Sequence, residues 1–134
     1  MMEDFERHLS EVKVYLETAE NLLESEPERW NPAVVNAVMA MVKTIDAAYL
    51  KYKGYRPEGG GRGHEATSKR LKELYDEALI DESFKGNVDS IKLFVDQRKT
   101  EIQYKGVSVS KNEAQRAVKS ARNLYDKMSR ELKN

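Results

Sequence analysis

The chain has no cysteine among its 134 residues. This absence excludes disulfide bonds, thiolate nucleophiles and zinc sites that are built on cysteine. Histidine is also scarce, because only His8 and His64 occur, and neither has the Glu-x-x-His spacing that di-iron helical bundles repeat. We therefore expect no metal site and no other cofactor.

Long apolar runs and strand signals are missing as well. No stretch of eighteen apolar residues occurs, and acidic residues stand where a signal peptide needs a basic segment followed by an apolar one. We expect a cytoplasmic protein that does not contact membranes. The length suits one domain with one hydrophobic core, spanning residues 1–134. The apolar segment 107–109 is too short to count as a strand, so we expect no sheet.

The formal net charge is zero, but the two ends of the chain differ in sign. Residues 1–30 contain nine acidic residues against three basic ones, whereas residues 98–134 contain ten basic residues against four acidic ones. An acidic first helix that lies near a basic last helix would explain this pattern, as would two solvated faces. The alternative is a basic surface for nucleic acid. It would be formed by Arg116, Lys119, Arg122, Lys127, Arg130 and Lys133.

The first two helices are predicted from apolar residues at alternating steps of three and four, the spacing that places side chains on one helix face. The first stripe consists of Phe5, Leu9, Val12, Leu16, Ala19 and Leu23, and its helix ends before Pro27. The second helix is predicted to have Asn31 as N-cap and Pro32 as its first residue, and to end at Gly54. Its stripe consists of Val35, Val38, Val42, Ile45, Tyr49 and Tyr52.

The third helix is predicted to be interrupted. A short piece carries Leu71, Leu74, Tyr75 and Ala78, the segment DESFKGN breaks it, and the next stripe consists of Val88, Ile91, Val95, Arg98 and Ile102. Ser110 and Glu113 predict a capping box at the start of the last helix. That helix carries the stripe Ala114, Val118, Ala121, Tyr125, Met128 and Leu132. The four helices predict an all-α fold, an antiparallel four-helix bundle.

Arg98 is the one charged residue of the third stripe, in a position that should face the core. Burying an unpaired guanidinium is costly. The residue either extends to solvent and pairs with Glu101, or lines a polar groove with Tyr104 and holds a phosphate or a nucleotide there. One interpretation of the loop at residues 54–68 is a second anion site, because Arg62 and His64 precede a helix N-terminus. The other interpretation of this loop is a flexible connection.

Three segments occur in a distinctive order: AAYLKYKGYRP ends the second helix, GRGHEATSKRLKEL follows in the loop, and QRKTEIQYKGVSVSKNEAQRAVKSARNLYDKMSREL comes last. In this order the chain resembles the HEPN superfamily of helical bundles over residues 5–132. Members of that family commonly dimerise, and they include metal-independent ribonucleases with an Arg followed, after four to six residues, by His. Arg98 matches this motif, but Tyr104 stands where the His is required.

The resemblance implies a binding or interaction module more readily than an enzyme. An unperturbed tyrosine titrates near pH 10, against about 6.5 for histidine, so Tyr104 is a poor general base at neutral pH. We expect a homodimer that binds a nucleotide, RNA or a partner nucleotidyltransferase. The alternative is a metal-independent endoribonuclease that uses Arg98 with Tyr104.

Overall fold

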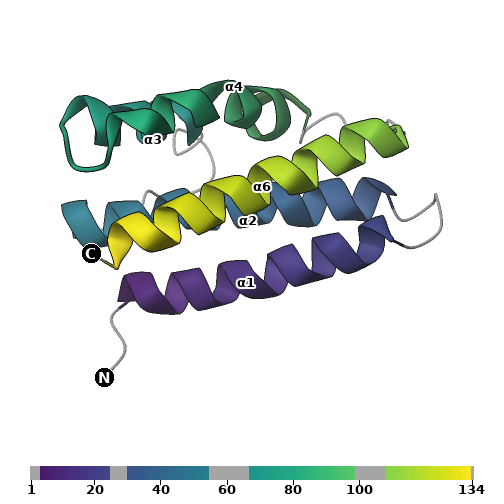
Figure 1. Ribbon diagram of the computed structural model, residues 1–134, viewed down its shortest axis with the longest axis horizontal. Coiled ribbons are helices and arrows are strands. Elements are labelled where there is room, and N and C mark those ends of the chain that lie inside the picture. Colours follow the sequence, from purple (N-terminus) through teal and green to yellow (C-terminus); the bar gives the residue numbers. More distant parts are fainter. Residues whose placement is uncertain (1–3, 25–29, 55–66, 99–107, 134) are drawn as a thin grey trace, which may run out of the picture.

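The computed structural model describes residues 4–24, 30–54, 67–98 and 108–133, which are almost entirely helical (Figure 1). In chain order the elements are α1 (Asp4–Leu23), α2 (Trp30–Lys53), α3 (Thr67–Asp76), the 3₁₀ helix η3 (Glu82–Asn87), α4 (Val88–Ile91), the π-helix η4 (Lys92–Arg98) and α6 (Lys111–Leu132). No strand occurs among these described residues. The prediction of an all-α fold is therefore confirmed.

The helix α2 lies at the centre of the fold. It packs against α1, α6, α3 and η4, and Figure 1 shows α1 lying along it in the opposite direction. Small side chains let these neighbours approach closely, since the buried residues of α2 include the alanines at 33, 37, 40, 47 and 48. Because α2 is covered on several sides, its buried surface is wider than the predicted stripe. Val35, Val42 and Tyr52 of that stripe are only partly buried.

The composition of α2 also resembles that of a membrane span. The helix is long and apolar enough to cross a bilayer, but 67% of its most apolar window is buried inside the protein. A central core helix meets the same criteria, because apolar side chains are needed around its whole circumference.

The predicted faces of α1 and α6 agree well with the structure. In α1, Phe5, Leu9, Val12, Leu16 and Ala19 are buried. The side chain of Ser110 accepts a hydrogen bond of 3.1 Å from the N–H of Glu113, which confirms Ser110 as the N-cap of α6. Arg122 on α6 donates two hydrogen bonds to the Glu20 carboxylate on α1, at 2.6 and 3.0 Å. The acidic first helix thus lies beside the basic last helix, as one interpretation of the charge pattern predicted.

The predicted third helix differs most from the structure. The break at DESFKGN is present as η3, which is capped by Asp81 through a 2.9 Å bond from the N–H of Ser83. The stripe after it was predicted with α-helical spacing, yet residues 92–98 form a π-helix. The predicted stripe residues Ile91 and Val95 are nevertheless buried, and Val88 is partly buried. Phe94, which the predicted stripe omits, is also buried, so the buried face is wider than the stripe.

The end of α3 is a Schellman motif with an unusual residue. The N–H of Leu79 donates to the carbonyl of Leu74, and the N–H of Ala78 donates to the carbonyl of Tyr75, both at 3.0 Å. This motif places Ala78 in the left-handed region, with a φ of 57°, where glycine is usual. Ala78 is exposed, so its predicted place on an apolar stripe was wrong. The helix ends before that residue and the chain reverses there.

Replacing Ala78 with glycine should raise the free energy of unfolding by about 0.5–1 kcal/mol. The left-handed conformation costs alanine roughly 1–2 kcal/mol, and the greater freedom of glycine in the unfolded chain offsets part of the gain. Urea and thermal melts measure the difference. Ala78→Val should be destabilising, and Lys72→Gly in the middle of α3 should cost about 1 kcal/mol. An Ala78→Gly protein that melts below the wild type would contradict strain at this position.

Candidate functional site

The structure describes no side chain of the four residues that the sequence singles out. Arg62, His64 and Tyr104 are outside the described residues. Arg98 is the last residue of η4, and its position in the backbone is described whereas its side chain is not. Their roles in anion binding or catalysis therefore stay predictions.

Asp96 in η4 links two described parts of the chain that lie near these residues in the sequence. One is the start of α3, and the other is the turn that ends at Arg98. One oxygen of its carboxylate accepts from the N–H of Thr67 at 3.1 Å, and the other accepts from the hydroxyl of Ser68 at 2.6 Å. Thr67 and Ser68 are buried, and they form the first turn of α3, directly after the long loop. Asp96 in η4 therefore caps a helix that begins 29 residues earlier in the chain. It holds the start of α3 next to the helical turn that ends at Arg98.

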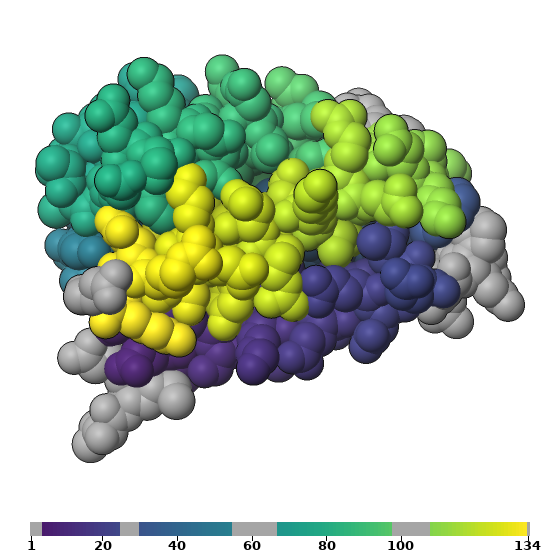
Figure 2. All heavy atoms as spheres, viewed as in Figure 1, coloured from purple at the N-terminus to yellow at the C-terminus, as the bar shows by residue number. Residues whose placement is uncertain are grey.

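A groove of about 400 Å³ lies between residues 86–94 and α6. Figure 2 shows the green to yellow surface of α6 bordering the teal surface of residues 67–98 along one face of the molecule. One side of the groove is lined by Gly86, Asn87, Asp89, Ser90, Leu93 and Phe94, and the other by Arg116, Lys119, Ser120 and Asn123. Arg116 and Lys119 belong to the basic stripe that was predicted on α6. No pattern in the sequence predicted the opposite wall.

Arg116 and Lys119 are the two basic residues of the groove. They are exposed and lie one helical turn apart on α6. Neither has an ion-pair partner in the part of the chain that the structure describes. Asp89 is the one acidic residue among the described lining residues, so the groove carries a net positive charge.

Hydrogen bonds between side chains form the wall behind these charges. Asn87 donates through Nδ2 to Oδ1 of Asn123 at 3.1 Å, and its own Oδ1 accepts from the ammonium of Lys127 at 2.8 Å. Lys127 also donates to the carbonyl of Ser83 at 2.8 Å and lies 4.5 Å from the centroid of the Phe84 ring. Burial among these groups lowers the pKa of Lys127 from its usual value. Lys127 is thus part of the packing of η3 against α6.

The predicted basic stripe on α6 is consequently divided between internal contacts and solvent. Arg122 is engaged by Glu20, and this pairing raises the pKa of the arginine. Lys127 is engaged by η3. The remaining basic residues of the stripe are exposed, namely Arg116, Lys119, Arg130 and Lys133. Of these four, Arg116 and Lys119 line the groove.

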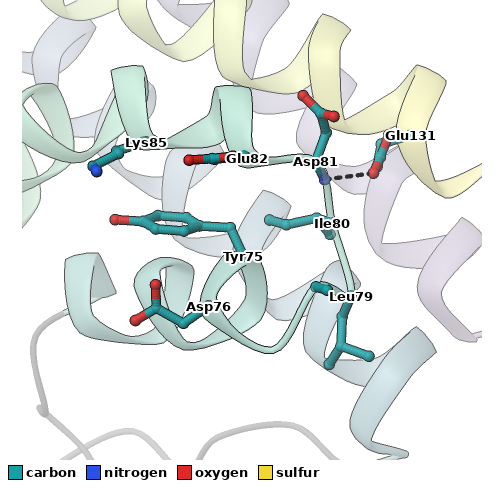
Figure 3. A pocket seen from close by; sticks show the side chains of 9 residues that line it. Tyr75, Asp76, Leu79, Ile80, Asp81, Glu82, Lys85 and Glu131 are labelled. Carbon is teal, nitrogen blue, oxygen red and sulfur yellow. Dashed lines mark hydrogen bonds between the residues drawn. The ribbon is translucent and has the colours of Figure 1, made fainter.

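A second hollow, of about 660 Å³, lies near the C-terminal end of α6 and has the opposite charge (Figure 3). Its lining includes four acidic residues, Asp76, Asp81, Glu82 and Glu131, and one lysine, Lys85. The N–H of Asp81 donates to Glu131 at 2.7 Å, and hydrogen bonds from Ser83 lower the pKa of the Asp81 carboxyl. Among the described residues no group of three or more acidic or histidine side chains is arranged to hold a metal ion. An anionic ligand would be repelled from this hollow.

Replacing Asp96 with alanine should lower the free energy of unfolding by about 0.5–2 kcal/mol, the usual cost of losing a helix N-cap. Asp96→Asn should cost less, because an amide oxygen still accepts from the N–H of Thr67. Asp89→Ala is the control, since this exposed residue should contribute within about 0.5 kcal/mol. Urea denaturation of the three variants measures these costs. Equal stability of the Asp96→Ala and Asp89→Ala proteins would show that the cap adds nothing.

Two comparisons bear on the identity of the chain. The family model described as HEPN domain matches residues 5–132. Comparison with curated proteins finds no significant match. The matched range covers nearly the whole chain, and the described part of it is helical, as the resemblance implied. The chain belongs to the HEPN domain family.

Proposed function

We propose that this protein is a module that binds an anionic ligand, a nucleotide or RNA. The ligand would bind in the groove between residues 86–94 and α6. The observation that carries the proposal is the pair Arg116 and Lys119, two exposed cations without ion-pair partners in the described residues, on the wall of a groove rich in hydroxyl and amide groups. Charge-assisted hydrogen bonds from arginine and lysine are the usual means of holding phosphate.

The charges elsewhere on the molecule support this groove as the site of an anionic ligand. The hollow beside Glu131 is acidic and opposes an anion, whereas Arg122 and Lys127 are held by contacts within the protein. Arg116 and Lys119 are exposed, so a phosphate that binds them displaces no ion pair with the residues that the structure describes.

Binding without chemistry fits the groove better than catalysis does. Its described lining residues include no histidine or tyrosine, the groups that a metal-free ribonuclease would use to move protons. The alternative, an endoribonuclease that uses Arg98 with Tyr104, has one observation in its favour. The π-helix η4 ends at Arg98, and such helices are frequent at functional sites.

Short single-stranded RNA should bind with an affinity that falls steeply with salt. Replacing Arg116 and Lys119 together with glutamine should reduce the slope of log affinity against log salt by about 1.4, since each phosphate contact in a single strand contributes roughly 0.7. The double variant Arg130→Gln and Lys133→Gln is the control, because it removes the same charge from exposed positions of α6 outside the groove. Fluorescence anisotropy at several salt concentrations measures both slopes.

The RNA samples from the same titrations distinguish a binding module from an endoribonuclease. With a chelator present, the RNA should remain intact on a gel after hours with the protein. Cleavage that disappears in an Arg98→Met variant would support the endoribonuclease instead. Equal slopes for the two double variants would remove the groove as the binding site.

We further propose that the protein is a homodimer that pairs through α2. Val35, Met39 and Val42 share one face of that helix and are only partly buried, although α2 is otherwise the central helix. Sedimentation of the wild type should give the mass of a dimer, and Met39→Lys should shift it to the monomer because a charge would enter the interface. A monomeric wild type would contradict the proposal and leave this face to another partner, such as a nucleotidyltransferase.

A further inference from the structure

The orientation of the Asn87 amide is fixed by a charge outside the groove. Asn87 is 8% exposed, so its amide cannot exchange its protein partners for water. Its neighbour Lys127 has only donors, at 2.8 Å, and must therefore face the amide oxygen. The opposite orientation would bring the Asn87 NH₂ group against an ammonium. The Nδ2 of Asn87 consequently points to Asn123.

This contact also determines the orientation of the Asn123 side-chain amide. Since Asn87 presents a donor, Asn123 accepts with Oδ1, at 3.1 Å. Its own Nδ2 then carries two N–H donors that have no acceptor within residues 4–24, 30–54, 67–98 and 108–133. Asn123 is exposed and lines the groove. The charge of Lys127 thus makes the free end of Asn123 a donor.

The other polar groups of the groove also suit an anion. Arg116 and Lys119 have no acceptors of their own. The hydroxyl of Ser120 lies 3.3 Å from that of Ser90, and the hydroxyl that accepts in this pair can still donate to a ligand. These groups can supply hydrogen bonds to the oxygens of a chain of phosphate groups that lies along the groove.

An aromatic surface for a base is lacking among the described lining residues. Phe94 is their one aromatic residue, and it is 2% exposed. Stacking on exposed aromatic rings is the usual means by which proteins hold unpaired bases. The groove therefore offers strong contacts to phosphate and weak ones to a base.

We infer that the groove recognises phosphate groups and not bases, with Asn123 as a phosphate donor and Lys127 as the residue that positions it. This inference rests on the proposed function, since it specifies the ligand chemistry of the same groove. It also separates Lys127 from Arg116 and Lys119. Those two residues would contact the ligand directly, whereas Lys127 acts through Asn87 and Asn123.

The ligand class is tested with inorganic tripolyphosphate, ATP and adenosine, titrated into the full chain by calorimetry without magnesium. Tripolyphosphate should bind at least as tightly as ATP, and adenosine should not bind at millimolar concentration. ATP binding that is about tenfold tighter than tripolyphosphate binding, or about 1.4 kcal/mol, would show base recognition and overturn the inference. RNA binding without tripolyphosphate binding would also overturn it but would leave the proposed function standing. Absence of binding by every anion would overturn both.

The role of Asn123 is tested by a change of one group. Asn123→Asp keeps an oxygen that accepts from Asn87 and replaces the NH₂ group with a second oxygen, so the fold should persist. Tripolyphosphate affinity should fall at least tenfold, because a donor becomes a negative charge. Lys133→Gln changes the net charge by the same amount at the exposed end of α6 and should alter the affinity less than about twofold. Equal effects of the two substitutions would overturn the role of Asn123.

The role of Lys127 is tested by substitution, with Arg130 as the matched control position. Lys127→Met should lower tripolyphosphate affinity by roughly tenfold because the amide pair can then reverse, and Lys127→Arg should restore most of it. Arg130→Met removes the same charge from an exposed position and should have little effect. In an Asn123→Ala background, Lys127→Met should cause no loss beyond that of Arg130→Met. A Lys127→Met protein that melts earlier but binds normally would show a purely structural lysine and overturn the inference.

Discussion

The burial of α2 on several sides is the constraint on which the rest of the fold depends. With no cysteine in the sequence, the chain has no disulfide bonds, so the hydrophobic core must supply its stability. A helix that is covered on several sides must satisfy the polar groups of its buried faces internally. Thr44 does so by donating to the carbonyl of Ala40 at 2.7 Å. Polar groups available to a ligand are therefore found at the periphery, between residues 86–94 and α6.

The position of α6, which forms one wall of the groove, is fixed by polar contacts along its length. At its start, the side chain of Asn31 accepts from the N–H of Val109 at 2.9 Å, so this residue reaches across to the last helix. Arg122 is bound to Glu20 in the middle, and Lys51 donates to the carbonyl of Leu132 at the end. Helix C-terminal carbonyls favour such a cation. These contacts hold α6 against α1 and α2, while the pairs Asn123 with Asn87 and Ser120 with Ser90 join it to the opposite wall of the groove.

Periodicity predicted the helices that have one buried face. The stripe of α1 and the cap of α6 follow from side-chain spacing and from the pair Ser110 and Glu113, which are local properties. The start of α2 differs slightly, because Trp30 is already helical and Asn31 lies inside the helix. The assumed α-helical period was wrong for residues 92–98, which form a π-helix, although Ile91 and Val95 of the predicted stripe are buried. Nothing local in that stretch signals the wider π turn.

The groove could be predicted only in part. The sequence identified the basic residues of α6, but choosing among them requires knowing that Arg122 is used by Glu20 and Lys127 by η3. Asn87 and Asn123 are 36 residues apart, and a hydrogen bond at that separation has no signature in side-chain spacing. The same holds for Asp96 and Thr67, which join two segments that each carry a predicted site residue.

The two hollows of opposite charge lie at different positions along α6, so an anionic ligand would meet a different charge at each. The lining of the groove beside Arg116 and Lys119 has a net positive charge, whereas the lining of the hollow beside Glu131, further along the same helix, has a net negative charge. Each lies against residues between Tyr75 and Phe94, so a ligand cannot move from one to the other without an electrostatic cost. If RNA binds at the groove as we propose, its strand is therefore disfavoured from entering the acidic hollow near the C-terminal end of α6.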